Sequence, residues 1–261
     1  MAKKPRPTPS PAVMRGRRDP ALSVEPVDWT PAPARRARQA AEEAEQQRRL
    51  REEQQRLNQQ RQQVAARISA GPSAPAPTTD HDLIALASAL AELDSTIFPA
   101  WEGTPWEFYG QSWEPRQGSI ACGYFVTTTL HQAGLHLQRT LLAKQTSETI
   151  IKNLVVEANI RRYRGLTTAE FVQAARAWGP GLYALGLDFH AAFLRVHDNG
   201  AVQMVHSSYL GTAAVVREAA ESSPALESKY RVLGKLSADD ALLRNWLLGR
   251  ALVAHGATVK S

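Results

Sequence analysis

Cysteine is nearly absent from this sequence of 261 residues, in which Cys122 is the only one. A single cysteine excludes an intramolecular disulfide and a zinc site built from several thiolates. Long apolar stretches are missing too, because no run of 18 or more apolar residues occurs. Such a chain offers no helix that would span a bilayer. We therefore expect no metal, no cofactor and no membrane span.

Aromatic residues are missing from residues 1–70, apart from Trp29. This segment nevertheless holds 15 of the 31 Lys and Arg residues and 8 of the 25 Asp and Glu residues. The net charge of +6 therefore belongs to a segment that cannot build a core, whereas the rest of the chain can. A basic excess can indicate nucleic acid, but here Arg alternates with Glu and Gln, which keeps a helix soluble and argues against that partner.

The composition divides the first part of the chain into three segments. Residues 1–34 are rich in Pro and Arg without periodicity, which predicts a disordered tail. Residues 35–70 consist of strong helix formers, with apolar residues seven apart at Leu50, Leu57 and Val64. The positions three residues further on are polar, so a solvated helix and a weak coiled coil that forms a homo-oligomer remain alternatives. Residues 71–79 are predicted to be a linker.

The first residues carry positive charge but no apolar run follows them, which is not the pattern of a Sec signal peptide. We expect a cytoplasmic protein, with signal-independent export as an effector left open.

The folded domain is predicted at residues 80–261, and its first half has helical periodicity. Helices are expected at residues 80–98, 122–133 and 137–154, and Thr167 with Glu170 forms a capping box for a helix that ends at Trp178. A further helix is expected through Leu248, capped by Ser237 with Asp240.

The second half changes to short apolar runs, at residues 182–187, 191–196 and 201–205, with a turn at Asn199 and Gly200 between the last two. Helices followed by antiparallel strands predict an α+β fold.

Cys122 lies where a loop rich in Trp and Gly passes into a predicted helix. A helix N-terminus carries free N–H groups and partial positive charge, which favour thiolate and can hold an oxyanion. Cys122 is therefore a candidate nucleophile with a lowered pKa, and a buried structural cysteine is the alternative. Gln117, just upstream, is a candidate oxyanion donor.

His190 is predicted on a strand beside small neighbours, where its imidazole has room to face a thiolate as general base. His206 lies on the strand predicted to pair with it, where a polar group can orient the His190 ring. Asp188, two residues from His190, is the rival for that orienting role. We expect Cys122 and His190 to form an ion pair.

A cysteine at a helix start, a histidine on a strand and a polar residue on the next strand, in that chain order, resemble the NlpC-type peptidases of the papain-like superfamily. The resemblance covers roughly residues 101–235 and implies helices packed on a small antiparallel sheet, with Cys122, His190 and His206 as catalytic residues. The chain departs from the family pattern, because it has Ala121-Cys122-Gly123 where NlpC proteins have Asp-Cys-Ser-Gly.

Two functions follow as hypotheses. The first is a thiol-dependent amide hydrolase that acts through an acyl-enzyme on a protein or a peptidoglycan peptide, as an effector, toxin or defence protease. Its substrate groove would be walled by Trp106, Trp113 and Tyr124. The second is a non-enzymatic adaptor with a helical oligomerisation segment, whose partner-binding surface consists of exposed aromatic residues. That surface would comprise Trp101, Trp106, Tyr109 and Trp113.

Overall fold

The computed structural model describes residues 32–69 and 92–252 of the chain. Residues 1–31 of the predicted tail and the predicted linker at residues 71–79 lie outside the described residues. The helix predicted to begin at Asp80 is described only from Glu92 onward. Contacts between residues separate two units, Met1–Ala41 and Glu42–Ser261, and the second contains the sheet. Within the described ranges, no helix is both long enough and apolar enough to cross a membrane.

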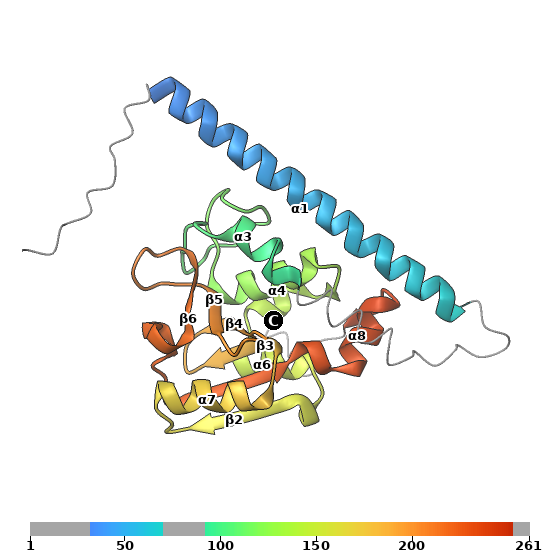
Figure 1. Cartoon of the computed structure of the whole chain (residues 1–261), viewed down its shortest axis with the longest axis vertical. Coiled ribbons are helices and arrows are strands. Elements are labelled where there is room, and N and C mark those ends of the chain that lie inside the picture. The colour runs from blue at the N-terminus through green and yellow to red at the C-terminus, as the bar shows by residue number, and fades with distance from the viewer. Residues whose placement is uncertain (1–31, 70–91, 253–261) are drawn as a thin grey trace, which may run out of the picture. The chain divides into compact units, whose positions relative to one another are not determined.

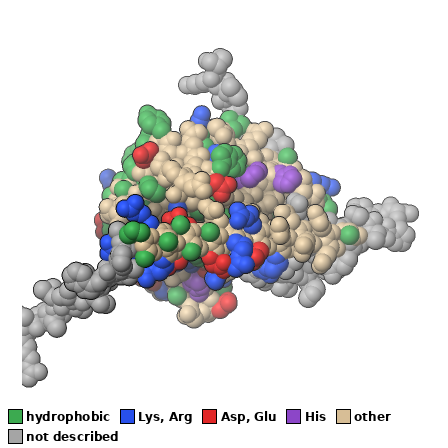
Figure 2. Space-filling model, turned by 90° about the horizontal axis from the view of Figure 1, so that it is seen from above, with side chains coloured by type: hydrophobic (Ala, Val, Ile, Leu, Met, Phe, Trp, Pro, Cys, Tyr) green, Lys and Arg blue, Asp and Glu red, His purple; other side chains and the backbone are tan. Residues whose placement is uncertain are grey.

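The helix predicted at residues 35–70 is present as α1 (Ala32–Ser69), which has 38 residues. Ion pairs link residues one turn apart on this helix. Arg48 and Arg49 donate hydrogen bonds to the Glu45 carboxylate at 2.6 and 3.0 Å. Such pairs support a helix whose sequence has little apolar periodicity. Charged side chains of both signs are interspersed on the face of the molecule seen in Figure 2. Pairing of α1 with a second chain stays a prediction.

A six-stranded antiparallel sheet forms the centre of the fold, in the order β2-β7-β3-β4-β5-β6 (Figure 1). Its strands are β2 (Ile160–Arg164), β3 (Gly181–Leu187), β4 (Ala191–Val196), β5 (Val202–Ser207), β6 (Val215–Ala219) and β7 (Tyr230–Lys235). A separate short pair joins β1 (His136–Leu137) to β8 (Ala251–Leu252) in parallel. The α+β class predicted from the sequence is therefore present, and β3, β4 and β5 match the three predicted apolar runs.

Helices cover both faces of this sheet. They are α3 (Ile97–Trp101), α4 (Cys122–Gln132), α5 (Arg139–Ala143), α6 (Ser147–Leu154), α7 (Thr168–Trp178) and α8 (Asp240–Leu247). Short 3-10 helices lie at η1 (Glu92–Asp94), η2 (Glu157–Asn159), η3 (Ala220–Ser222), η4 (Pro224–Leu226) and η5 (Leu236–Ala238). Successive residues of a strand point to opposite faces, so Leu182 of β3 joins the cluster with α4 while Tyr183 joins the cluster with α7.

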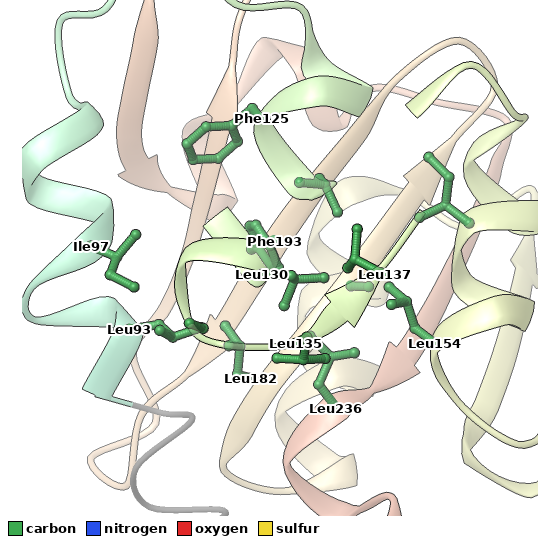
Figure 3. Close-up of a cluster of buried hydrophobic side chains, with 14 of the residues drawn as sticks. Leu93, Ile97, Phe125, Leu130, Leu135, Leu137, Leu154, Leu182, Phe193 and Leu236 are labelled. Carbon is green, nitrogen blue, oxygen red and sulfur yellow. The ribbon is translucent and has the colours of Figure 1, made fainter. Parts of the chain in front are cut away.

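The core beside α4 is built on aromatic rings, and Figure 3 shows Phe125 of α4 above Phe193 of β4. Their ring centroids lie 6.0 Å apart, and the Phe98 ring of α3 lies 4.8 Å from that of Phe193. All three side chains are fully buried. Truncation of such a phenylalanine costs about 3–5 kcal/mol, so this contact holds α4 firmly against the sheet.

Three predicted helix boundaries are wrong. Residues 137–154 do not form one helix, because Thr146 accepts a hydrogen bond from the Thr149 N–H and starts α6 as a separate helix. The helix predicted at residues 80–98 is not continuous where it is described, because η1 is followed by a turn and then by α3, a separate helix with Thr96 as its N-cap. Pro99 is tolerated in the first turn of α3 because its N–H would have no helical partner there. The cap of α8 is Asp239, which accepts from the Leu242 N–H, rather than Ser237.

Candidate active site

Cys122 is the first residue of α4, and the loop before it is fixed from two sides. The Ala121 N–H donates to the Gly110 carbonyl at 2.9 Å, and the Ser207 hydroxyl of β5 donates to the Ile120 carbonyl at 2.6 Å. Ala121 is extended and its side chain does not cap the helix. No side-chain cap therefore takes up the first-turn N–H groups of α4, and they can donate to groups near Cys122.

Close packing against α5 determines the residue after the cysteine. A Cβ atom on Gly123 would overlap the backbone carbonyl oxygen of Ala143, at the end of α5. Only glycine allows the two helices to approach this closely. The start of α4, and with it the position of Cys122, is thus set by a backbone contact.

His190 stands immediately before β4, one residue outside the strand on which the sequence predicted it. Asp188 and Phe189 form a tight turn between β3 and β4, closed by the Leu187 N–H, which donates to the His190 carbonyl at 2.8 Å. The His190 side chain is 5% exposed. Its Nδ1 atom is buried and has no hydrogen-bond partner among the described residues.

His206 lies on β5 next to β4, as predicted, and it is fully buried. Its Nδ1 atom is 2.8 Å from Nε2 of His190, and the two rings meet edge to face with centroids 5.0 Å apart. The structure therefore brings the predicted base and the predicted orienting residue into direct contact.

Two further residues extend this contact. Nε2 of His206 is 3.0 Å from a carboxylate oxygen of Glu218, on β6. The Ser223 hydroxyl donates to the same Glu218 oxygen. Neither residue is predicted from the sequence, because the run around Glu218 is not recognisable as a strand without its neighbour β5.

Cys122 and His190 line the same pocket, a cavity of about 610 Å³. The predicted groove residues Trp106 and Tyr124 also line it. The buried Tyr124 hydroxyl has no hydrogen-bond partner among the described residues. The remaining aromatic walls are Phe108, Tyr109, Phe189 and Tyr209, and Lys144 is the only Lys, Arg, Asp or Glu among the described lining residues.

Other predicted site residues lie elsewhere. The Asp188 carboxylate accepts from the Ser228 hydroxyl and the Lys229 N–H, both at 2.8 Å, and these bonds turn it away from the orienting role. Gln117 is exposed and does not line the pocket, whereas Gln111 does. Trp113 also lies outside the pocket lining, because its ring stacks on the Arg139 guanidinium, 3.9 Å from the ring centre.

Burial shapes the electrostatics of Cys122. It raises the pKa of the thiol, although backbone N–H groups of Ala191, Gly123 and Cys122 itself act in the opposite direction. Ala191 directly follows His190 in the chain, so the thiol lies close to the beginning of β4. The predicted lowering of the Cys122 pKa is therefore wrong, because desolvation of the thiolate outweighs the effect of the N–H groups at the helix N-terminus.

Both imidazoles are held neutral as well. Burial, together with the nearby His206, lowers the pKa of His190 to about 3. Burial also lowers the pKa of His206, although its hydrogen bond with Glu218 acts in the opposite direction. These pKa shifts favour a neutral thiol and a neutral imidazole over the ion pair expected from the sequence.

No group of three or more His, Cys, Asp or Glu side chains in residues 32–69 and 92–252 is arranged to hold a metal ion. Comparisons of the chain with models of protein families, with curated proteins and with solved structures find no match. Function is therefore inferred from the chemistry of the site.

Proposed function

We propose that the chain is a thiol-dependent amide hydrolase of the papain-like, NlpC type, with Cys122 as nucleophile and His190 as general base. One observation carries the proposal. The buried Nδ1 atom of His190 has no partner among the described residues, and the His190 side chain lines a pocket that Cys122 also lines. A buried nitrogen without a hydrogen bond costs folding free energy. We therefore expect this nitrogen to have a function, which is to accept a proton from a group in the pocket.

The chemistry needs one nucleophile and one proton carrier. As the Cys122 sulphur attacks the carbonyl carbon of a bound amide, its proton passes to Nδ1 of His190. The carbonyl oxygen gains the negative charge and is held by first-turn N–H groups of α4. His190 then returns the proton to the leaving amine, and a thioester on Cys122 remains. Water, deprotonated by His190, attacks this thioester and releases the acid and the free thiol.

The neutral resting state suits this sequence of steps. Charge would appear only when a carbonyl is present to accept it, because burial disfavours a separate thiolate and imidazolium. The free thiol is then protected from water-borne electrophiles until a substrate fills the pocket. The same burial makes a bound oxyanion interact strongly with the α4 N–H groups.

The pocket walls indicate what kind of substrate enters. Aromatic side chains favour a peptide with an apolar group beside the amide bond that is cut. A carboxylate on the substrate would find Lys144 at the same pocket. A protein or a peptidoglycan peptide therefore remains the proposed substrate, acted on in the cytoplasm or after export as an effector or toxin.

A non-enzymatic adaptor is the second candidate, and exposed rings at the pocket favour it. Phe108, Tyr109 and Phe189 are 71%, 82% and 94% exposed, which is a large apolar surface for a monomer. Trp101 cannot contribute to such a surface, because it is fully buried in the core. In a hydrolase, the same three exposed rings would guide a peptide substrate toward Cys122.

Formation of an acyl-enzyme separates the two functions. The protein is incubated with p-nitrophenyl acetate, and acetylation of Cys122 is followed by mass spectrometry in the parent, Cys122→Ser and His190→Ala proteins. A hydrolase acetylates Cys122 and turns over, whereas an adaptor shows no acetylation that depends on His190.

A further inference from the structure

Four side chains, from the turn before β4, from β5, from β6 and from the segment after β6, form one continuous row of hydrogen bonds. His190 Nε2 and His206 Nδ1 are 2.8 Å apart, and His206 Nε2 is 3.0 Å from Glu218. Ser223 completes the row with its bond to the same carboxylate oxygen. The row begins at the proposed active-site pocket and ends at Ser223, just after the edge strand β6.

The register of the sheet explains how Glu218 reaches a histidine. On β5 and β6, His206 stands opposite Val216, and Met204 stands opposite Glu218. Glu218 is therefore the diagonal neighbour of His206 on the same face, within reach of a long side chain. Ser223, which is 2% exposed, then anchors the carboxylate from the segment that follows β6.

The donors and acceptors in this row determine where each proton sits. A carboxylate only accepts hydrogen bonds, so Nε2 of His206 carries the proton that points to Glu218. A neutral His206 then has a bare Nδ1, which accepts from His190. His190 must carry its own proton on Nε2, which leaves a free lone pair on Nδ1.

We propose that Glu218 is a positioning residue that acts through His206 to hold His190 in the tautomer with a free Nδ1 lone pair. The catalytic part of this inference rests on the proposed function, but the tautomer itself does not. Glu218 touches no reacting atom, and neither does His206. Their role is to choose which nitrogen of His190 is basic and to fix the direction in which it points.

The negative charge of Glu218 also contributes when His190 takes up a proton. The groups that face His190 are His206, the Cys122 thiol and the Tyr209 ring, whose centroid lies 5.9 Å away. None of them is an anion while Cys122 is a thiol, so the nearest carboxylate in the row is that of Glu218. Attraction through the polarised His206 stabilises the imidazolium that forms during attack.

A ring-nitrogen experiment tests the tautomers without any substrate. Two-bond ¹H–¹⁵N spectra of histidine-labelled full-length protein distinguish imidazoles protonated at Nδ1 from those protonated at Nε2. We expect the signals of both His190 and His206 to be those of the Nε2–H form in the parent protein. In Glu218→Gln the amide can donate as well as accept, so a mixture of tautomers should appear at both rings.

The matched control is Glu221→Gln, a nearby acid that pairs with Arg176 instead of a histidine. It should leave the histidine spectra unchanged. An Nδ1–H tautomer at His190 in the parent, or identical spectra for the parent and Glu218→Gln, would overturn the proposal.

Acetylation of Cys122 by p-nitrophenyl acetate tests the catalytic consequence. Glu218→Gln should slow the reaction at least about 10-fold, because part of His190 then presents the wrong nitrogen. In a protein that already carries His206→Ala, the same change should have no further effect, because Glu218 acts only through that ring. Full additivity of the two changes would contradict the proposed route. If the tautomers are as expected but Cys122 is never acetylated in the parent, the hydrolase fails and the positioning of His190 stands.

Discussion

Burial and backbone N–H groups shift the pKa of the Cys122 thiol in opposite directions, and the effect of burial is the larger. The N–H groups at the start of α4 and at Ala191 favour the thiolate, but the pKa of the thiol is nevertheless raised. The neighbouring imidazole offers no positive charge, because burial also keeps His190 neutral. Reactivity at this residue should therefore depend on the electrophile that is offered.

The pH dependence of alkylation by iodoacetamide, which reacts with the thiolate, measures the pKa of the Cys122 thiol. The alkylation rate of the folded protein should reach half its maximum at a higher pH than that of the same chain unfolded in urea. The unfolded chain should behave as an ordinary cysteine, with a pKa of about 8.5. A folded-state midpoint below the unfolded one would show instead that Cys122 and His190 form an ion pair at rest.

The candidate pair of Cys122 and His190 could be predicted from the sequence, but Glu218 and Ser223, which extend the hydrogen bonds from His206, could not. Cys122, His190 and His206 stand at positions that a helix start and two paired strands bring together. Proximity in sequence makes Asp188 a candidate orienting residue for His190, but its carboxylate accepts hydrogen bonds from Ser228 and Lys229 instead. Glu218 reaches the site only through the β5–β6 register, which no local pattern contains.

At the scale of elements, the approach of α4 to α5 determines the position of Cys122, the candidate nucleophile. Replacement of Gly123 by alanine would force the two helices apart, because the new Cβ would meet the Ala143 carbonyl. We expect a loss of about 1–3 kcal/mol in the free energy of unfolding, together with slower acetylation of Cys122.

The matched control is Gly118→Ala, which changes the loop that leads to the same helix. Gly118 has a φ of +74° but open space around its Cα, so alanine there costs backbone strain without displacing α4. Urea unfolding and the acetylation rate are measured for both variants. Equal acetylation rates would mean that the α4–α5 contact does not position the cysteine.

Elements with a clear local signal were predicted well, and those defined by distant partners were not. The capping box of Thr167 with Glu170 is present and starts α7, and Gly134 follows α4 with a φ of +91°. The strands β2 and β7 were missed because Arg and Lys interrupt their apolar pattern. Each is stabilised by pairing with a strand far away in sequence, such as Ile160 of β2 opposite Gly234 of β7.

At the scale of the whole molecule, two buried neutral histidines link folding to pH. The pKa values of His190 and His206 are lowered in the folded protein, so below about pH 6.5 the unfolded chain binds protons that the folded chain does not. Stability should therefore decrease as pH falls from about 6.5 toward 3. Each histidine contributes a slope of at most about 1.4 kcal/mol per pH unit.

Urea unfolding of the parent and of His190→Gln at several pH values checks this. The variant should lose less stability on acidification, whereas a control substitution at the exposed His136 should follow the parent. A parent whose free energy of unfolding is the same at pH 7 and pH 4.5 would show that these histidines are not held neutral by the fold.

Acylation of Cys122 is the most direct test of the central claim, that Cys122 and His190 act as one catalytic unit. The burst of p-nitrophenol from p-nitrophenyl acetate at neutral pH is measured alongside the mass of the Cys122 peptide. The parent should form and then lose an acetyl group on Cys122, and His190→Ala should form it about 10²–10⁴-fold more slowly. Cys122→Ser should form none. Equal acetylation of the parent and His190→Ala, at the rate of a free thiol, would contradict the claim and leave Cys122 a structural residue.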